Sequence, residues 1–398
     1  MLNDQRFDAP VIHVVSESPR LEMLQTRLRQ AGLRPVPVRG SYLPPDSAPA
    51  LIDNLTHRSE FDGLDNRLIV TIGKQGLSTV HSDIHLADVA QIESLPARLA
   101  IRQRESQRQR EIQLRARTAE KFGTGTASAT PVGRARVLWL GQDAPFLNAI
   151  KSNLAEAQVT LVAAISRLTA EDYLASGRFQ TLVLCPASAN DEAAKLLTRV
   201  KSMQIVTIPR VVLLLRPELA GQISSEDMSN ADEILDLSSN LESIANNLHA
   251  LSHEVLVERD AHQIPAGMIE DHATGLVSRE YLESHLEAQM EQADRLLIPL
   301  TVVAFTLTPE HDIRSVALTI KSMLRDTDLA ARLDSQHVCI TLPETSYRGA
   351  VVLSRRIEEA VGGRLSWRAI ERRQFHTLKT LIGGLTAKSP FTRQRTAS

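Results

Sequence analysis

Short apolar runs that alternate with helical patterns constrain the fold of this chain most, and a first set of them fills the N-terminal quarter. Apolar runs at 10–15, 50–52 and 68–72 accompany a helical pattern over 19–31. Strands of this length that alternate with helices are typical of a parallel sheet covered by helices. The first set therefore predicts a doubly wound α/β domain at residues 9–100.

A second set of runs repeats this order. It follows a stretch rich in glycine, threonine, serine and proline at 123–133, which has the composition of a linker. The expected strands are at 135–140, 158–163, 181–185, 211–215 and 231–235. The repeated order indicates an internal duplication. It predicts a second α/β domain at 133–250, with a connecting helix at 251–266.

Residues 95–121, between the two sets, are rich in arginine and glutamine. One interpretation is a phosphate-binding arm. The other is a solvated connecting helix whose arginines are interspersed with Glu105, Glu111 and Glu120. We favour the helix because no aromatic side chain is interleaved for stacking on bases. Residues 101–132 are accordingly assigned to a connecting helix and a linker.

The composition argues against several classes of partner. Lysine and arginine total 45 against 47 aspartate and glutamate, so no basic surplus points to nucleic acid or to an anionic membrane. The longest apolar runs, such as 210–216, are far too short to span a bilayer, and the first eight residues lack an apolar signal core. Cys185 and Cys339 are expected to be reduced core thiols of a cytoplasmic protein, without a disulfide or a metal site.

The third expected domain, at residues 267–388, carries the sharpest motif. Its segment 271–282 has the sequence D-H-A-T-G-L-V-S-R-E-Y-L. It resembles the entry motif of GGDEF domains, D-x-L-T-G-L-x-N-R-R-x-F, with departures at Ala273 and Ser278. Further segments resemble the family's first strand, the approach to its signature hairpin, and the strand and helix behind it. In the family's order, these segments are 299–305, 325–333, 340–345 and 350–361.

The resemblance implies a fold for this third domain. Residues 380–385 resemble the last core strand of GGDEF domains, so we expect a mixed, largely antiparallel sheet. A basic tail at 389–398 is expected in place of the closing helix that usually follows. The two preceding domains then resemble receivers, an order found in PopA-like and PleD-like proteins. The expected fold class is therefore α/β, with two doubly wound receiver-like (flavodoxin-like) domains and a truncated GGDEF-like domain.

The resemblance also implies where a diguanylate cyclase would hold its divalent metal, which neutralises phosphate charge during phosphoryl transfer. Thr306 and Thr308 stand where the family has a D-x-D pair, and Gln336 and His337 replace the two acids of the signature hairpin. The stretch 309–325 is also too short for the family's guanine-reading segment. We therefore expect no catalytic residue, no metal, no cofactor and no cyclase activity.

The family's product site, by contrast, has a counterpart in this chain. Its R-x-x-D motif, five residues before the signature, corresponds to Arg325 and Asp328, and a further product-contacting arginine corresponds to Arg356. A guanidinium offers a planar fork for phosphate or guanine, and a carboxylate can accept from guanine N–H groups. The resemblance thus implies cyclic di-GMP as the ligand. The alternative is a surface ion pair at a helix end.

Receiver chemistry needs an aspartate that accepts phosphate and an acidic pair that holds magnesium. In the first domain Asp53 is the candidate phosphoacceptor, but Ser16-Glu17 stands in place of the acidic pair. An ordinary loop aspartate is an equally good interpretation. In the second domain Gly141-Gln142 stands in place of the acidic pair, and Cys185 takes the acceptor position. We therefore expect that this domain cannot accept phosphate. We expect the second domain to be an interaction or dimerisation module.

The preferred hypothesis is a noncatalytic cyclic di-GMP receptor or adaptor in bacterial signalling. By resemblance to PopA-like proteins, the ligand would change the protein's localisation, at a cell pole in that group, or its hold on a protein partner in signalling or regulated proteolysis. A homodimer through the receiver-like domains is a further expectation. The alternative is a ligand-free scaffold of relic domains, which would have no reason to keep Arg325, Asp328 and Arg356 in register.

Overall fold

The structure is a computed structural model, and it describes residues 9–16, 20–38, 43–44, 48–53, 67–73, 82–122, 135–141, 143–176, 179–203, 209–261, 269–309, 311–362 and 365–386. The chain divides into two compact units. One consists of Met1–Glu105 and Thr130–Asp260, and the other of Ser106–Ala129 and Ala261–Ser398. Over the described ranges, no helix is both long enough and apolar enough to cross a membrane.

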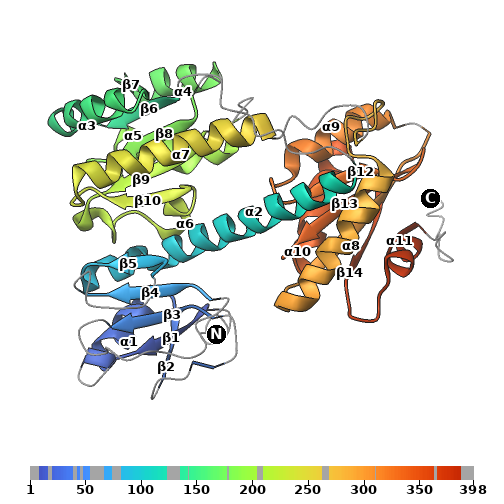
Figure 1. Ribbon diagram of the computed structural model, residues 1–398, viewed down its shortest axis with the longest axis horizontal. Coiled ribbons are helices and arrows are strands. Elements are labelled where there is room, and N and C mark those ends of the chain that lie inside the picture. Colours follow the sequence, from blue (N-terminus) through green and yellow to red (C-terminus); the bar gives the residue numbers. More distant parts are fainter. Residues whose placement is uncertain are drawn as a thin grey trace, which may run out of the picture. The chain divides into compact units, whose positions relative to one another are not determined.

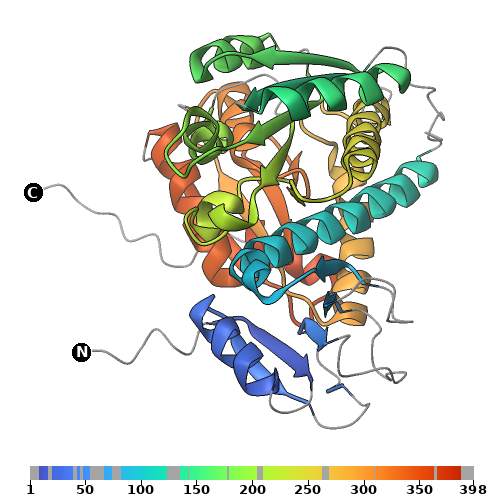
Figure 2. The same cartoon turned by 90° about the vertical axis from the view of Figure 1, so that its left-hand side faces the viewer.

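The first sheet has five parallel strands in the order β2-β1-β3-β4-β5. The strands are β1 (Val11–Val15), β2 (Arg34–Pro37), β3 (Ala50–Asp53), β4 (Ile69–Ile72) and β5 (Ile84–Leu86). Helix α1 (Arg20–Gln30) buries Leu24 and Leu28 against this sheet. Figures 1 and 2 show this helix beside the strands. The strand order is that of flavodoxin-like folds, so the prediction of a receiver-like first domain is confirmed.

The strands of the second sheet are all parallel and lie in the order β10-β9-β8-β6-β7. Read from β7 to β10, this is the same order as in the first sheet. Its strands are β6 (Arg136–Gly141), β7 (Thr160–Ala164), β8 (Thr181–Cys185), β9 (Arg210–Leu215) and β10 (Glu233–Asp236). Its helices are α3 (Ala144–Glu156), α4 (Arg167–Ala175), α5 (Glu192–Arg199), α6 (Ser225–Met228) and α7 (Leu241–Ala261). Leu138 and Leu184 face one apolar cluster, and Trp139 and Val183 face another. The prediction of a second doubly wound domain is confirmed.

Helix α2 (Leu95–Lys121) covers the arginine-rich stretch, so the helix predicted there is confirmed. It follows the 3₁₀ helix η1 (Val89–Ser94). Two further 3₁₀ helices are η2 (Val200–Ser202) and η3 (Pro217–Leu219). Because the unit boundary falls within α2, its last part, Ser106–Lys121, belongs to the second unit. We call Ser106–Lys121 the α2 segment.

The third sheet has four antiparallel strands in the order β12-β13-β11-β14. Its strands are β11 (Leu300–Thr306), β12 (Leu329–Arg332), β13 (His337–Pro343) and β14 (Ser366–Glu371). Its helices are α8 (Arg279–Leu296), α9 (Ile313–Met323), α10 (Tyr347–Val361) and α11 (Leu378–Thr386). Side chains of β11 alternate between two apolar clusters. Val302 and Ala304 pack with α8 and α11, whereas Val303 and Phe305 pack with α9 and α10.

The strand predicted at 380–385 is wrong, because these residues lie in helix α11. Leu381, Ile382 and Leu385 are buried together, and their spacing places them on one face of a helix. Strand β14 takes the edge position in the sheet, beside β11. A helix therefore does close this domain. The basic tail predicted at 389–398 lies outside the described residues.

Candidate functional site

The entry motif of the third domain forms a tight turn ahead of α8. Asp271 accepts from the backbone N–H of Thr274 at 2.9 Å and from its hydroxyl at 2.7 Å. Gly275 has a φ of +67°, a left-handed conformation that favours glycine. Ser278 then caps α8 by accepting from the N–H of Tyr281. In this chain the motif therefore shapes the backbone of the turn, and the carboxylate of Asp271 is used by Thr274 within the motif.

The places where a cyclase would hold metal lie at the carboxyl end of β11 and in the hairpin beside it. The backbone N–H of Leu307 donates to the carbonyl of Gln336 at 2.7 Å, which joins the two segments. Thr306 ends β11, and the exposed Thr308 places its hydroxyl 2.9 Å from Nδ1 of His311. The side chains at this junction thus offer hydroxyls and an amide where carboxylates would be needed for Mg²⁺.

His337 has a local partner in the hairpin. Its Nδ1 lies 2.9 Å from each carboxylate oxygen of Asp334, three residues earlier. Asp334 also accepts from the backbone N–H of Gln336 at 2.7 Å. Within the described part of the chain, no group of three or more His, Cys, Asp or Glu side chains could hold a metal ion. These contacts account for His337 as part of the hairpin turn.

Arg325 and Asp328, two of the three predicted ligand residues, form one turn. Asp328 Oδ2 accepts from the backbone N–H of Arg325 at 2.9 Å, and the N–H of Asp328 donates to the carbonyl of Arg325 at 3.0 Å. The side chain of Arg325 is exposed, just after α9. Arg356 is exposed on α10, which contacts α9. The structure thus brings Arg325 and Asp328 together, whereas Arg356 shares no described contact with them.

Asp328 is held in an unusual state for a carboxylate. It is only 8% exposed, and its Oδ1 has no hydrogen-bond partner among the described residues. Burial raises its pKa to about 6, although the N–H of Arg325 and the charges of Arg325 and Arg115 act in the opposite direction. Buried polar atoms are nearly always paired, and side chains whose pKa is shifted by burial concentrate at functional sites. Asp328 is therefore the residue of the domain that most suggests a ligand site.

Replacing Asp328 by asparagine is expected to change how stability depends on pH. The folded-state pKa lies above the ordinary value of 3.8, so the folded form holds the proton more tightly, and that stabilisation is lost as pH rises through about 6. Between pH 5 and 7.5 the wild type should lose about 1.4 kcal/mol that the Asp328→Asn variant does not lose. Urea unfolding followed by Trp367 fluorescence, in a Trp139→Phe background, measures this. Parallel pH profiles would contradict the raised pKa.

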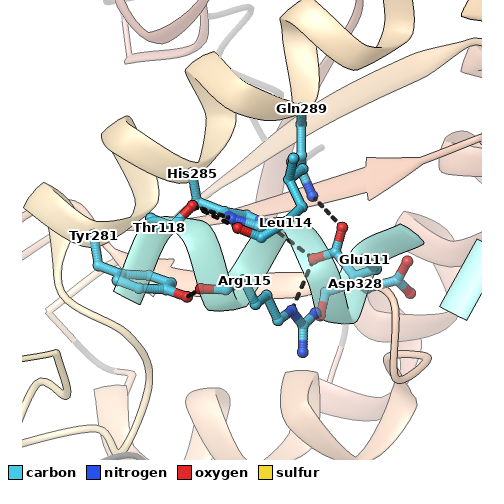
Figure 3. A network of polar contacts seen from close by, with 8 residues as sticks. All are labelled: Glu111, Leu114, Arg115, Thr118, Tyr281, His285, Gln289 and Asp328. Carbon is cyan, nitrogen blue, oxygen red and sulfur yellow. Dashed lines mark hydrogen bonds and ion pairs between the residues drawn. The ribbon is translucent and has the colours of Figure 1, made fainter. Parts of the chain in front are cut away.

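A buried polar cluster lies beside this turn, and Figure 3 shows its members on α2 and α8. We define the Glu111 cluster as Glu111, Arg115, His285 and Gln289. The Glu111 carboxylate accepts from His285 Nε2 and Arg115 Nε, each at 2.8 Å, and from Gln289 Nε2 at 3.2 Å. Burial alone would raise the pKa of Glu111, but the hydrogen bonds and charges of His285 and Arg115 outweigh it and lower the pKa. The cluster is therefore a buried carboxylate that accepts three hydrogen bonds, while Gln289 Oε1 has no partner among the described residues.

His285 is fully buried between two partners on α2. The hydroxyl of Thr118 donates to the carbonyl of Leu114 at 3.0 Å, which leaves its oxygen to accept from His285 Nδ1 at 3.1 Å. Nε2 faces the Glu111 carboxylate and donates to it. Both ring nitrogens of His285 therefore have a partner on α2.

The α2 segment has two more attachments in the same unit. Arg115 Nη2 donates to the backbone carbonyl of Asp328 at 3.0 Å, so the cluster is joined to the Arg325–Asp328 turn (Figure 3). Farther along, Gln107 Nε2 donates to Glu344 at 2.7 Å, and Arg110 pairs with the same carboxylate. The α2 segment is thus attached to the third domain at Glu344, after β13, and at the Arg325–Asp328 turn, before β12.

The interpretation of residues 95–121 as a solvated helix is wrong for the α2 segment. Glu111 is 5% exposed and Thr118 is 1% exposed. They lie at helical spacing with Leu114, which is a weak sign of a buried face. A glutamate and a threonine do not form an apolar stripe, so this face could not be recognised from the sequence. Neither Glu111 nor His285 was among the predicted site residues.

The candidate phosphoacceptor Asp53 is the last residue of β3 and is fully buried. Its Oδ2 accepts from Arg20 Nε at 2.7 Å and from Ser16 Oγ at 2.8 Å. Asp53 therefore lies at the end of a strand, which is where a receiver carries its phosphoacceptor, and not in a loop. An arginine and a hydroxyl hold the carboxylate where a receiver would have an acidic pair and magnesium. Phosphorylation of Asp53 stays a prediction.

The corresponding place in the second domain is filled by apolar and backbone atoms. Cys185 ends β8 and is buried, which raises the pKa of its thiol to about 11. A Cβ at Gly141 would lie 2.6 Å from the carbonyl oxygen of Cys185, so only glycine fits there. Asp143 and Arg216 pair at 2.8 Å. This packing leaves no carboxylate at the acceptor position.

Comparison with known proteins identifies the third domain. Residues 268–390 match the family model described as diguanylate cyclase, GGDEF domain. The chain therefore contains a GGDEF domain, and two domains of receiver-like topology precede it. The match covers less than half of the chain.

Solved structures resemble separate parts of the chain. The GGDEF domain of DgcB from Caulobacter crescentus, solved with c-di-GMP, is 15% identical with a TM-score of 0.27, over 29% of this chain and 81% of that chain. The FimX GGDEF domain from Pseudomonas aeruginosa is 16% identical with a TM-score of 0.27, over 29% and 86%. A CheY-like receiver domain protein from Methanospirillum hungatei is 16% identical with a TM-score of 0.26, over 31% and 98%. No curated protein matches the chain.

Proposed function

We propose that the GGDEF domain of this chain binds cyclic di-GMP without making it, and that the protein is a receptor or adaptor in bacterial signalling. The observation that carries the proposal is the Arg325–Asp328 turn. There an exposed guanidinium stands beside a carboxylate whose Oδ1 has no partner among the described residues. Burying a carboxylate with a partnerless oxygen costs free energy, and a contact with a ligand would offset that cost.

The chemistry of the ligand suits these residues. Cyclic di-GMP presents two phosphates and two guanines. Arg325 can donate a planar fork to a phosphate or to the Hoogsteen edge of guanine, or stack on its face. Asp328 can accept from guanine N–H groups. Arg356, exposed on the neighbouring helix α10, would add a second cation for the ligand's phosphates.

The noncatalytic part of the proposal is supported by the side chains at the metal places. Thr306, Thr308 and Gln336 are poor ligands for Mg²⁺, which prefers carboxylates and phosphate oxygens. Without the metal, the charge on the transferring phosphoryl group would not be neutralised. The receiver-like domains then have no enzyme to control, which supports an adaptor that contacts a protein partner or a second copy. By resemblance to PopA-like proteins, the site of action would be the cytoplasm and a cell pole.

One observation favours the alternative of a ligand-free scaffold. Asp328 is 8% exposed and cannot meet a guanine in this state of the turn. Calorimetric titration of the purified full-length protein with cyclic di-GMP separates the two functions. Saturable binding supports the receptor. Absence of binding at ligand concentrations well above the micromolar range would leave the scaffold.

The purified protein is also expected to form no cyclic di-GMP from GTP with Mg²⁺ or Mn²⁺. The reason is the absence of carboxylates at Thr306, Thr308 and Gln336. Chromatography of the nucleotides after incubation measures the product, with an active diguanylate cyclase as the positive control. Product above the level of a protein-free sample would contradict the proposal of a noncatalytic domain.

A further inference from the structure

The α2 segment contacts the turn that carries the proposed ligand residues. Arg115 Nη2 donates to the backbone carbonyl of Asp328 at 3.0 Å, while its Nε donates to Glu111 at 2.8 Å. Glu111 is in turn bound by His285 of α8 at 2.8 Å. Figure 3 shows these contacts following one another from α8 through α2 to the turn. The turn is therefore tied to a helix whose own attachment is buried.

The closed turn hides the group that a guanine would need. Asp328 Oδ2 is used by the backbone N–H of Arg325, and Oδ1 is buried. A cavity of about 20 Å³ is lined by Thr327 of the turn and by Glu111 and Leu114 of the α2 segment. Asp328 does not line this cavity and is only 8% exposed. Binding of guanine to Asp328 therefore requires the turn to open.

Opening the turn acts against the contact with α2. The carbonyl of Asp328 is fixed by Arg115, and Arg115 is itself oriented by Glu111. If the turn moves outward, this bond breaks, and a charged donor loses its acceptor in a half-buried place. The docked α2 segment and the open turn are thus alternative states of one domain.

We infer that the α2 segment and cyclic di-GMP compete for the Arg325–Asp328 turn, and that Arg115 is the residue that positions the turn in its closed state. This inference rests on the proposed function. Competition of this kind is reciprocal: the factor by which docking weakens the ligand is the factor by which the ligand weakens docking. Ligand binding would then release the α2 segment from the domain. This release is the structural change by which the adaptor would signal that cyclic di-GMP is bound.

Titration of full-length Arg115→Ala with cyclic di-GMP tests the inference. Loss of the bond to Asp328 should tighten binding by about 5-fold or more, the usual lower range of coupling between two sites. Arg117→Ala is the matched control, because Arg117 is exposed on the same helix and its loss removes the same charge. It should leave binding unchanged or slightly weaker. Arg115→Lys keeps a charged donor and should fall between wild type and Arg115→Ala.

Hydrogen–deuterium exchange in the amides of 106–121 provides a second readout. Saturating cyclic di-GMP should make these amides exchange faster in the wild type, because the ligand displaces the helix from its docked state. If Arg115 only stabilised the domain, Arg115→Ala should bind the ligand more weakly, and the ligand should not accelerate amide exchange in residues 106–121.

The outcomes separate this inference from the proposed function. Binding by Arg115→Ala that is no tighter than binding by Arg117→Ala, with no ligand-dependent acceleration, overturns the competition and leaves the receptor intact. If Arg115→Ala does not fold, Arg115→Lys and the exchange experiment decide. If neither wild type nor any variant binds, the receptor proposal fails and the competition with it.

Discussion

Arg325→Ala is expected to weaken binding of cyclic di-GMP by about 10- to 100-fold. Charge-assisted hydrogen bonds contribute about 1.5–3 kcal/mol each, and about 1.4 kcal/mol corresponds to one decade in affinity. Arg325→Lys should not restore binding, because an ammonium group cannot supply the planar fork. Asp328→Ala should weaken binding as well, because guanine N–H donors lose their acceptor. Calorimetric titration of each full-length variant measures these effects.

A matched control distinguishes a specific contact from general attraction. Arg314 is exposed on α9, so Arg314→Ala removes the same charge a short distance along the chain. Its effect should be small and should vanish in high salt, where exposed charges are screened. Unfolding midpoints of Arg325→Ala and wild type should agree, because Arg325 is exposed. Equal losses in Arg314→Ala and Arg325→Ala would show that position 325 has no special role.

Glu111→Ala is expected to destabilise the GGDEF domain by about 3–5 kcal/mol, the usual cost of breaking a buried ion pair. Removal of the carboxylate leaves His285, which is fully buried, and Arg115 without their shared acceptor. Glu111→Gln retains the shape and one acceptor, so its loss should be smaller. The measurement is urea unfolding followed by the fluorescence of Trp367, with Trp139 of the second sheet replaced by phenylalanine.

Glu120→Ala provides the control for this destabilisation. Glu120 lies on the same helix, is exposed, and should change the free energy of unfolding by less than about 0.5 kcal/mol. If Glu111→Ala unfolds at the same urea concentration as Glu120→Ala, the Glu111 cluster does not fix the α2 segment to the domain. In that case the competition inferred above would also lose its structural basis.

The order of the three domains could be predicted from the sequence because local patterns determine it. The strands expected at 10–15 and 181–185 and the helix expected at 95–121 agree closely with β1, β8 and α2. A strand buried on both faces is a short apolar run wherever it occurs, so its partners need not be known. The error at 380–385 came from matching a family's last strand to an apolar segment whose spacing is that of a helix.

By itself, the sequence determined the strand and helix pattern of two receiver-like domains and the candidacy of Arg325 and Asp328. Only the tertiary structure decided that Asp328 is buried with an oxygen that has no partner among the described residues, and that Glu111 is not on a solvated face. The physical reason is that burial of a charge depends on its partners. Glu111 meets His285 across 174 residues of chain, and Arg115 meets Asp328 across 213. No local pattern around a glutamate in an arginine-rich helix records a histidine so far along the chain.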